Sequence, residues 1–204
     1  MTPRNKTALI LTSVTLTMST PLVMVLGGRR IPMFQHLGFE KDLIASPLSW
    51  LLAAAVGAIY LVYTLRAIPF IAKMQREVSR LKLLGILAAL VGGIVEEVCF
   101  RRWLMDQLMF GGFGPVVQVM VSGVAFGFAH ASWMLFKHDF RFVLPAIVST
   151  SILGVSLAFI YLFGGRNLGP CIMAHVMINL VLEPWLILSA VSGKWKTGET
   201  TGLT

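Results

Sequence analysis

Apolar residues occur along this chain in long stretches, separated by short polar or basic segments. Six stretches are long enough for a transmembrane helix, which needs about 20 mostly apolar residues. They cover residues 8–27, 47–65, 83–110, 114–136, 142–163 and 170–190. The stretches lack the two-residue alternation of barrel strands, and a helix pairs its backbone groups internally, as lipid requires. The pattern therefore predicts an all-α integral membrane protein with about six transmembrane helices.

The composition agrees with this class. Of the 204 residues, 56% are hydrophobic and only 13% are charged, whereas soluble domains contain roughly 25% charged residues. The net charge of +8 does not require a nucleic-acid partner, because basic residues collect in the cytoplasmic loops of membrane proteins. We expect one membrane domain over residues 1–204, with the lipid bilayer as its surroundings and no nucleic acid bound.

The basic residues also predict an orientation. With the N-terminus inside, eleven of them fall on the cytoplasmic side and four on the outer side, which the positive-inside rule favours. The inner set is Arg4, Lys6, Arg66, Lys73, Arg76, Arg80, Lys82, Lys137, Arg141, Lys194 and Lys196, and the outer set is Arg29, Arg30, Lys41 and Arg166. Arg29 and Arg30 directly follow the first stretch and oppose this orientation. We expect both termini on the inside.

The segment 66–82 between the second and third stretches has a pattern of its own. Ile71, Met74, Val78 and Leu81 recur at helical spacing, with basic residues between them. This spacing predicts an amphipathic, basic helix at the membrane surface. A solvated connector is the alternative.

The third stretch contains charges where lipid should surround the chain. Glu97 and Arg101 are four residues apart, so they share a helix face and can pair. Glu96 lies about 100° around the helix from Glu97 and needs a different partner. A charge at the bilayer centre costs on the order of a few kcal/mol, and it is by default a functional hypothesis.

Two other stretches also have polar groups inside them. His130 lies in the fourth, and His175 and Asn179 share one helix face in the sixth because they are four residues apart. Each alone could be a hydrogen-bonding contact between helices. Together with the glutamates, they predict an intramembrane polar site built by helices 3, 4 and 6. Glu183, which precedes Pro184, is interpreted as a kink or boundary residue outside that site.

These residue types are suited to activating water. A carboxylate can act as a general base, a histidine can orient the water or carry a proton, and an Asn with a second His can donate to an oxyanion. Together they could hydrolyse a peptide bond without a covalent nucleophile. Two histidines and a glutamate are also plausible zinc ligands, although the HExxH spacing is absent.

Three motifs follow one another on successive stretches. EEVCFR (96–101) fits EExxxR, FGFAH (126–130) fits FxxxH, and HVMIN (175–179) fits HxxxN. In this order they resemble the CAAX protease and bacteriocin-processing (CPBP, or Abi) family of intramembrane proteases. That family includes the endopeptidase that trims prenylated CAAX proteins. The resemblance covers roughly residues 83–185.

The resemblance implies a role for each motif residue. Glu96 would be the catalytic glutamate, and His130 its partner in activating water. His175 and Asn179 would bind the oxyanion. The substrate would be a membrane-anchored protein or peptide, and the membrane a bacterial or archaeal cytoplasmic membrane.

The resemblance also implies which residues stabilise the site and whether it needs a cofactor. Glu97 and Arg101 would brace the site through their pair. We prefer a glutamate-type mechanism with no obligatory metal and no cofactor. The alternative is zinc held by Glu96, His130 and His175.

The predicted orientation places the site within the membrane. Glu96 lies about 20 Å from the cytoplasmic end of its helix, by the rise per residue. This depth favours a site that opens outward and acts on translocated substrates, whereas the opposite orientation would reverse it. The resemblance includes bacterial relatives similar to sortase-like processors, and it implies C-terminal membrane anchors as substrates. The rival interpretations are a non-proteolytic membrane scaffold or immunity protein of the same fold, and an acyl-transfer or lipid-modifying enzyme.

Overall fold

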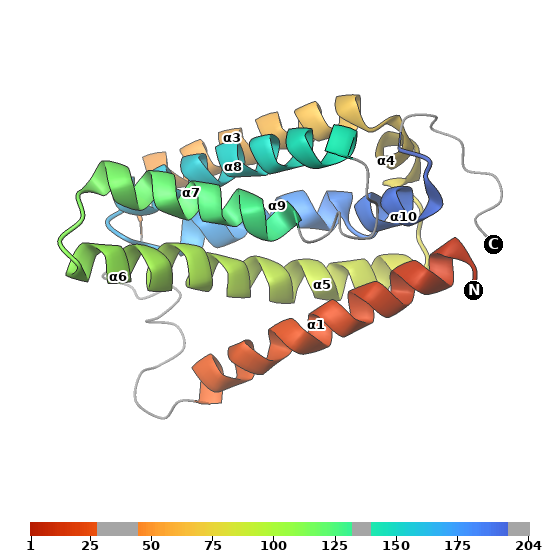
Figure 1. The fold of residues 1–204 in the computed structure, drawn as a ribbon, viewed down its shortest axis with the longest axis horizontal. Coiled ribbons are helices and arrows are strands. Elements are labelled where there is room, and N and C mark those ends of the chain that lie inside the picture. The colour runs from red at the N-terminus through yellow and green to blue at the C-terminus, as the bar shows by residue number, and fades with distance from the viewer. Residues whose placement is uncertain (28–44, 132–139, 196–204) are drawn as a thin grey trace.

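The computed structural model describes residues 1–27, 45–131 and 140–195, and all regular structure in these ranges is helical (Figure 1). The α-helices are α1 (Pro3–Gly27), α3 (Pro47–Ala67), α4 (Pro69–Met74), α5 (Arg80–Glu97), α6 (Met105–Phe110), α7 (Pro115–Ala131), α8 (Phe140–Phe163), α9 (Gly169–Leu182) and α10 (Trp185–Ser192). A π-helix, η1 (Val98–Leu104), joins α5 to α6.

The described helices confirm an all-α membrane protein. Three are long and apolar enough to cross a bilayer: Pro47–Ala67, the continuous Arg80–Phe110 and Val143–Phe163. Helices α9 and α10 form a fourth such span if they are counted together, with a bend of 46° between them. The total of six stays a prediction. Helix α7 is shorter than predicted, and residues 132–136 of its stretch lie outside the described residues.

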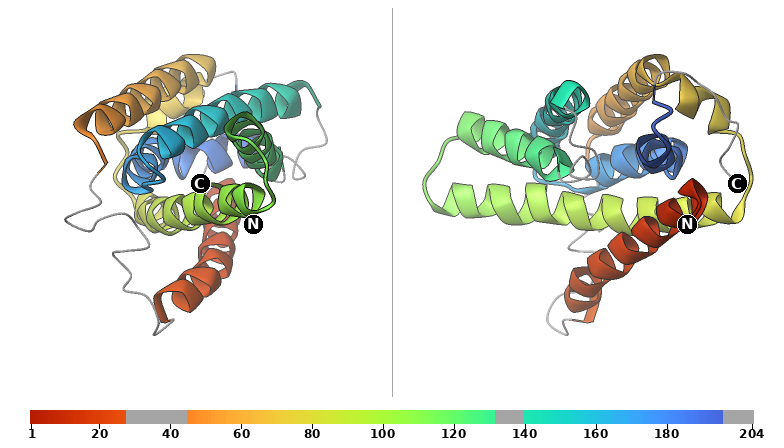
Figure 2. Two further views of the ribbon diagram at one scale, coloured as in Figure 1. Left: turned by 90° about the vertical axis from the view of Figure 1, so that its left-hand side faces the viewer. Right: turned by 45° about the vertical axis from the view of Figure 1, so that its right-hand side comes forward.

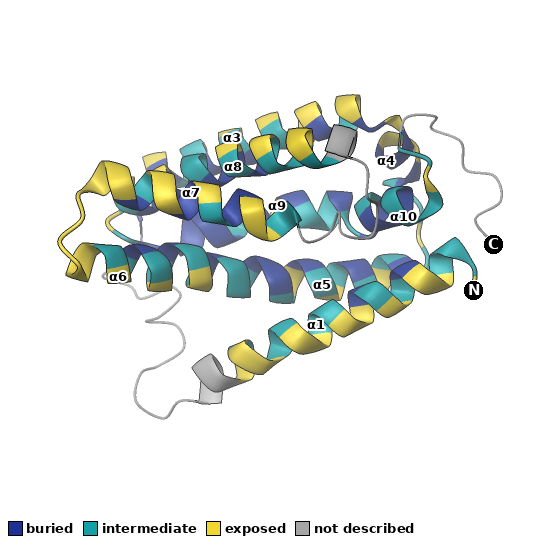
Figure 3. Cartoon of the chain, viewed as in Figure 1, coloured by how far each residue is buried: buried dark blue, intermediate teal, exposed yellow. Residues whose placement is uncertain are grey.

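Helix α9 lies in the interior of the bundle. It contacts α3 on one side and α5 on another, while α7 packs along α8. The N-terminal part of α1 lies against α5, and the rest of α1 diverges from the other helices (Figures 1 and 2). The outer faces carry exposed apolar side chains such as Leu16, Ile59 and Ile152, and the buried residues face inward (Figure 3). An apolar exterior of this kind suits lipid.

Glycines let neighbouring helices approach closely at two crossings. A Cβ atom at Gly93 of α5 would lie 2.7 Å from Cγ2 of Val176 in α9. A Cβ atom at Gly127 of α7 would lie 2.7 Å from the carbonyl oxygen of Ile147 in α8. Small residues at such crossings are typical of helix packing in membranes. Gly93 thus brings the motif-bearing helices α5 and α9 together, and Gly127 lets α7 pack closely against α8.

The prediction of one surface helix over 66–82 is wrong. Helix α4 has only six residues, and Ile71 and Met74 are buried against the bundle while Val78 is 94% exposed. Pro69 starts α4, and the Ser79 hydroxyl accepts a hydrogen bond from the first turn of α5. These two residues divide the segment, so its apparent helical period does not belong to one helix.

Many basic residues lie at one end of the bundle, where α1 and α5 begin and α3 ends (Figure 1). This group comprises Arg4, Lys6, Arg66, Lys73, Arg76, Arg80, Lys82 and Lys194. Arg4 forms two hydrogen bonds with the Glu77 carboxylate, at 2.7 and 2.9 Å. At the opposite end, Arg166 pairs with Asp106 at 2.6 Å. These are eight of the eleven residues that the sequence assigned to the inner side, and Lys137 and Lys196 of that set lie outside the described residues. The orientation itself stays a prediction.

Candidate active site

The two adjacent glutamates close α5, and the helix changes its pitch directly after them. Residues Val98–Leu104 form the π-helix η1, and single π-turns inside α-helices often occur at functional sites. The Ser122 hydroxyl of α7 donates to the carbonyl oxygen of Phe100 within this turn, at 2.9 Å. The sequence did not predict this turn, because a partner from another helix helps to stabilise it.

Glu97 is fully buried and pairs with two side chains. Its Oε2 lies 3.0 Å from Arg101 Nε, at ion-pair distance but without hydrogen-bond alignment. Its Oε1 lies 2.8 Å from His175 Nδ1. The Arg101 pair was predicted, whereas the link to His175 was not. A buried charge is tolerated only when it is paired, so this carboxylate connects the end of α5 to α9.

The contact with Glu97 also determines which nitrogen of His175 carries the proton. An ionised carboxylate only accepts hydrogen bonds, so Nδ1 must be the donor. In the neutral imidazole, Nε2 then has a free lone pair. This nitrogen lies 3.9 Å from Oε2 of Glu96.

His130 is held in the same way on α7. Its Nδ1 lies 2.9 Å from the backbone carbonyl oxygen of Phe126, which can only accept. In the neutral ring, Nε2 therefore has the free lone pair. This nitrogen lies 3.5 Å from Oε2 of Glu96. Glu96 and His130 are each about one-fifth exposed. The two histidines and Glu96 thus direct three acceptor atoms at one place.

Asn179 and Glu183 follow His175 along α9. The Asn179 side chain is half-buried and has no hydrogen-bond partner among the described residues.

Helix α9 ends at Leu182, and Glu183 lies at the bend before α10. This confirms Glu183 as a boundary residue. The Lys82 ammonium of α5 donates to the Glu183 carbonyl oxygen at 3.1 Å, and so satisfies an acceptor at the end of α9.

The side chains of Glu96, His130 and His175 have the geometry of a metal site. Each of them offers one ligand atom, and these three atoms lie within 4.8 Å of one another. Ligand atoms of tetrahedral zinc lie about 3.3 Å apart, close to the observed 3.5 and 3.9 Å. Each histidine also donates its other ring N–H to a fixed oxygen, as metal-bound histidines do. These residues therefore fit a zinc ion as well as a water molecule.

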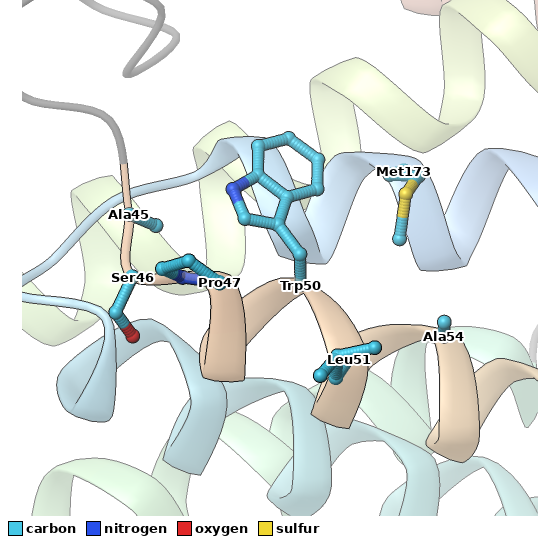
Figure 4. A pocket seen from close by; sticks show the side chains of 7 residues that line it. All are labelled: Ala45, Ser46, Pro47, Trp50, Leu51, Ala54 and Met173. Carbon is cyan, nitrogen blue, oxygen red and sulfur yellow. The ribbon is translucent and has the colours of Figure 1, made fainter.

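An apolar hollow on the surface lies apart from this polar site. It is lined by Trp50 and Leu51 at the start of α3 and by Met173 of α9, among others (Figure 4). Met173 precedes His175 by two residues, a turn of about 200° around the helix. The two side chains therefore point to different sides of α9, and none of the polar site residues lines the hollow.

The comparisons with known proteins bear on this polar site. A family model described as type II CAAX prenyl endopeptidase Rce1-like matches residues 79–181. A search of curated proteins found no match, and neither did a search of solved structures. The matched segment is half of the chain and contains all three motifs with their converging side chains. The protein therefore belongs to the Rce1-like family of CAAX endopeptidases.

Proposed function

We propose that this protein is an intramembrane endopeptidase in which Glu96 and His130 activate a water molecule. The family indicates a CAAX protease-like peptidase and a membrane-anchored peptide substrate. The observation that carries the proposal is the distance of 3.5 Å between Oε2 of Glu96 and Nε2 of His130. Both atoms are acceptors, so one water molecule can donate a hydrogen bond to each.

The reaction is a hydrolysis with Glu96 as the general base. The water oxygen attacks the carbonyl carbon of the peptide bond while Glu96 takes a proton from the water. The C–N bond of the tetrahedral intermediate then breaks, and Glu96 returns the proton to the leaving amine. His130 keeps the water oriented, because its Nδ1–H is held by the carbonyl oxygen of Phe126. General acid–base catalysis of this kind contributes about 10²–10⁴-fold.

Helix α9 supplies the groups that would stabilise the oxyanion. The Asn179 amide has no partner among the described residues and can donate a hydrogen bond to it. His175 can donate through Nε2 only as an imidazolium, because its Nδ1–H is already bonded to Glu97. The buried Glu97 carboxylate stabilises that cation. We therefore assign Glu97 an electrostatic role towards His175, in addition to its pair with Arg101.

A zinc-dependent form of the same site is the competing proposal. Glu96, His130 and His175 would hold the ion, which would supply Lewis-acid activation of a water molecule. Metal analysis of the purified protein decides between the two. Stoichiometric zinc that is lost together with activity in His130→Ala would replace the glutamate-type mechanism. Activity that survives full removal of metal by chelators would support it.

We also propose which side of the membrane the site opens to. We place the basic end of the bundle in the cytoplasm, because positive residues favour that side. The Glu96 site then lies within the membrane and opens towards the outer side, where it would act near the end of a membrane anchor. A reporter fused after Lys194 tests this placement. A periplasmic signal from such a fusion would reverse it.

The function is tested in cells that express the wild type or Glu96→Gln. Mass spectrometry of their membrane proteins should find a truncated, membrane-anchored protein only with the wild type. The new chain ends would identify the cleaved bond. Identical proteomes at equal expression of the two forms would favour a non-proteolytic scaffold with the same fold.

A further inference from the structure

Phe126 has no polar side-chain atom, yet its side chain lies among the charged and titratable groups of the site. It is fully buried on α7, four residues before His130. We infer that Phe126 is a positioning residue, whose ring holds both site histidines and Arg101 in their working orientations. The kinetic consequence of this inference rests on the proposed function.

The ring contacts groups from all three motif-bearing helices. Its centroid lies 4.4 Å from that of the His130 imidazole and 5.4 Å from that of His175, the latter edge-on at 76°. Cζ of Arg101 lies over its face, 4.6 Å from the centroid. Phe100 of η1 packs edge-on against it at 5.3 Å. One side chain thus touches α5–η1, α7 and α9 at the point where their polar groups meet.

These contacts depend on the aromatic electrons and not only on shape. The face of a phenyl ring is electron-rich, so it attracts the Arg101 guanidinium. The ring edge is positive, and edge-to-face contacts between aromatic rings contribute about 0.5–1.5 kcal/mol beyond the buried area. Arg101 Nη1 and Nη2 are buried without a hydrogen-bond partner among the described residues. The ring of Phe126 is therefore a contact for the part of the guanidinium that Glu97 does not bind.

The backbone of Phe126 adds a second constraint. Its carbonyl oxygen accepts the Nδ1–H of His130 at 2.9 Å, so the same residue fixes both the tautomer and the ring plane of that histidine. A substitution leaves the carbonyl in place and removes only the ring contacts. Side-chain variants therefore isolate the contribution of the ring.

Three variants separate positioning from packing. Phe126→Leu keeps an apolar side chain but removes the ring, and Phe126→Tyr keeps the ring. Phe128→Leu is the matched control, because Phe128 is on the same helix and 62% exposed. Steady-state cleavage of a fluorogenic peptide that carries the cleavage site found by mass spectrometry would be measured in detergent, together with the melting temperature of each variant.

We expect Phe126→Leu to lower kcat about tenfold or more while KM changes less than about twofold, because the ring orients catalytic groups and does not bind substrate. Phe126→Tyr should recover most of this loss, and Phe128→Leu should match the wild type. A loss that is equal in the Leu and Tyr variants and follows their melting temperatures would make Phe126 an ordinary core residue. Unchanged kcat in Phe126→Leu would also overturn the inference.

A readout independent of activity keeps this test separate from the proposed function. The imidazole C–H resonances of histidine-labelled protein report on the rings near Phe126, and assignment uses His130→Gln and His175→Gln. In Phe126→Leu we expect both sets to move and to broaden or split, while in Phe128→Leu they stay. Unmoved resonances would refute the positioning role even if the wild type proved to cleave nothing. Moved resonances in a protein without peptidase activity would refute only the function.

Discussion

Two carboxylate–arginine pairs in this molecule have the same chemistry in opposite surroundings. Arg4 and Glu77 form a double hydrogen bond at the basic end, with each side chain 30% exposed. Glu97 and Arg101 form their pair in the interior with no exposure at all. Exposed pairs contribute about 0–1 kcal/mol, whereas breaking a buried pair costs about 3–5 kcal/mol. The buried pair lies within one helical segment, and Glu97 also contacts His175 of α9. Its cost in the interior therefore agrees with the proposed electrostatic role of Glu97 towards His175.

The largest expected effect on stability comes from breaking the buried pair. Glu97→Gln leaves the Arg101 guanidinium as an uncompensated buried charge, so we expect a loss of about 3–5 kcal/mol. The amide oxygen of the new glutamine can still accept from His175. The variant should be produced in low yield and should melt well below the wild type in detergent.

The double variant Glu97→Gln/Arg101→Met is the matched control. It removes both charges together, and apolar replacements of buried pairs are often neutral or better. We expect its melting temperature to recover most of the loss, while the catalytic rate stays low because no carboxylate stabilises the His175 cation. A double variant with both stability and activity restored would show that the pair has only a structural role.

The smallest expected effect belongs to the exposed pair. Hydrogen bonds from Arg4 lower the pKa of the Glu77 carboxyl below its usual value of 4.5. A lowered carboxyl pKa stabilises the folded state above the unfolded pKa, and the contribution is lost as the pH falls through the folded value. Arg4→Ala should therefore cost at most about 1 kcal/mol at pH 7. The difference in melting temperature between this variant and the wild type should shrink as the pH is lowered below 4.5.

A difference that does not depend on pH would mean that Arg4 acts through the packing of α1 and not through its charge. Glu77→Gln supplies the control, since it should reproduce the loss at pH 7 and show the same convergence at low pH. Activity should be unaffected in both variants, because this pair lies at the basic end of the bundle, away from Glu96.

The sequence alone predicted the local part of this arrangement. The four-residue spacing was sufficient to place Glu97 beside Arg101, and the three motifs were sufficient to identify the family. The contacts of Glu97 with His175, and of Glu96 with both histidines, join residues about 34 to 79 positions apart in the sequence, so helical periodicity could not reveal them. They depend on how α5, α7 and α9 are arranged in the bundle. Glycines permit the close approach of α5 to α9 and of α7 to α8, but they do not specify it.

Two features were missed for related reasons. The π-turn after Glu97 depends partly on Ser122 of another helix, and its own residues have no pattern that differs from an α-helix. The segment 66–82 was predicted as one helix because its apolar residues recur at helical spacing. Pro69 and Ser79 divide it, and residues such as Met74 turn inward to the core. Helical spacing led us to expect these apolar side chains to face the membrane surface, whereas Ile71, Met74 and Leu81 are buried inside the bundle.

Single-turnover cleavage by purified protein would show whether Glu96 is the general base of a peptide hydrolysis. Wild type and Glu96→Gln would be compared on one membrane-anchored substrate, with circular dichroism and the melting temperature as controls for folding. We expect Glu96→Gln to stay folded and membrane-inserted while its cleavage rate falls by about 10² or more. Unaltered turnover by folded Glu96→Gln would contradict the mechanism.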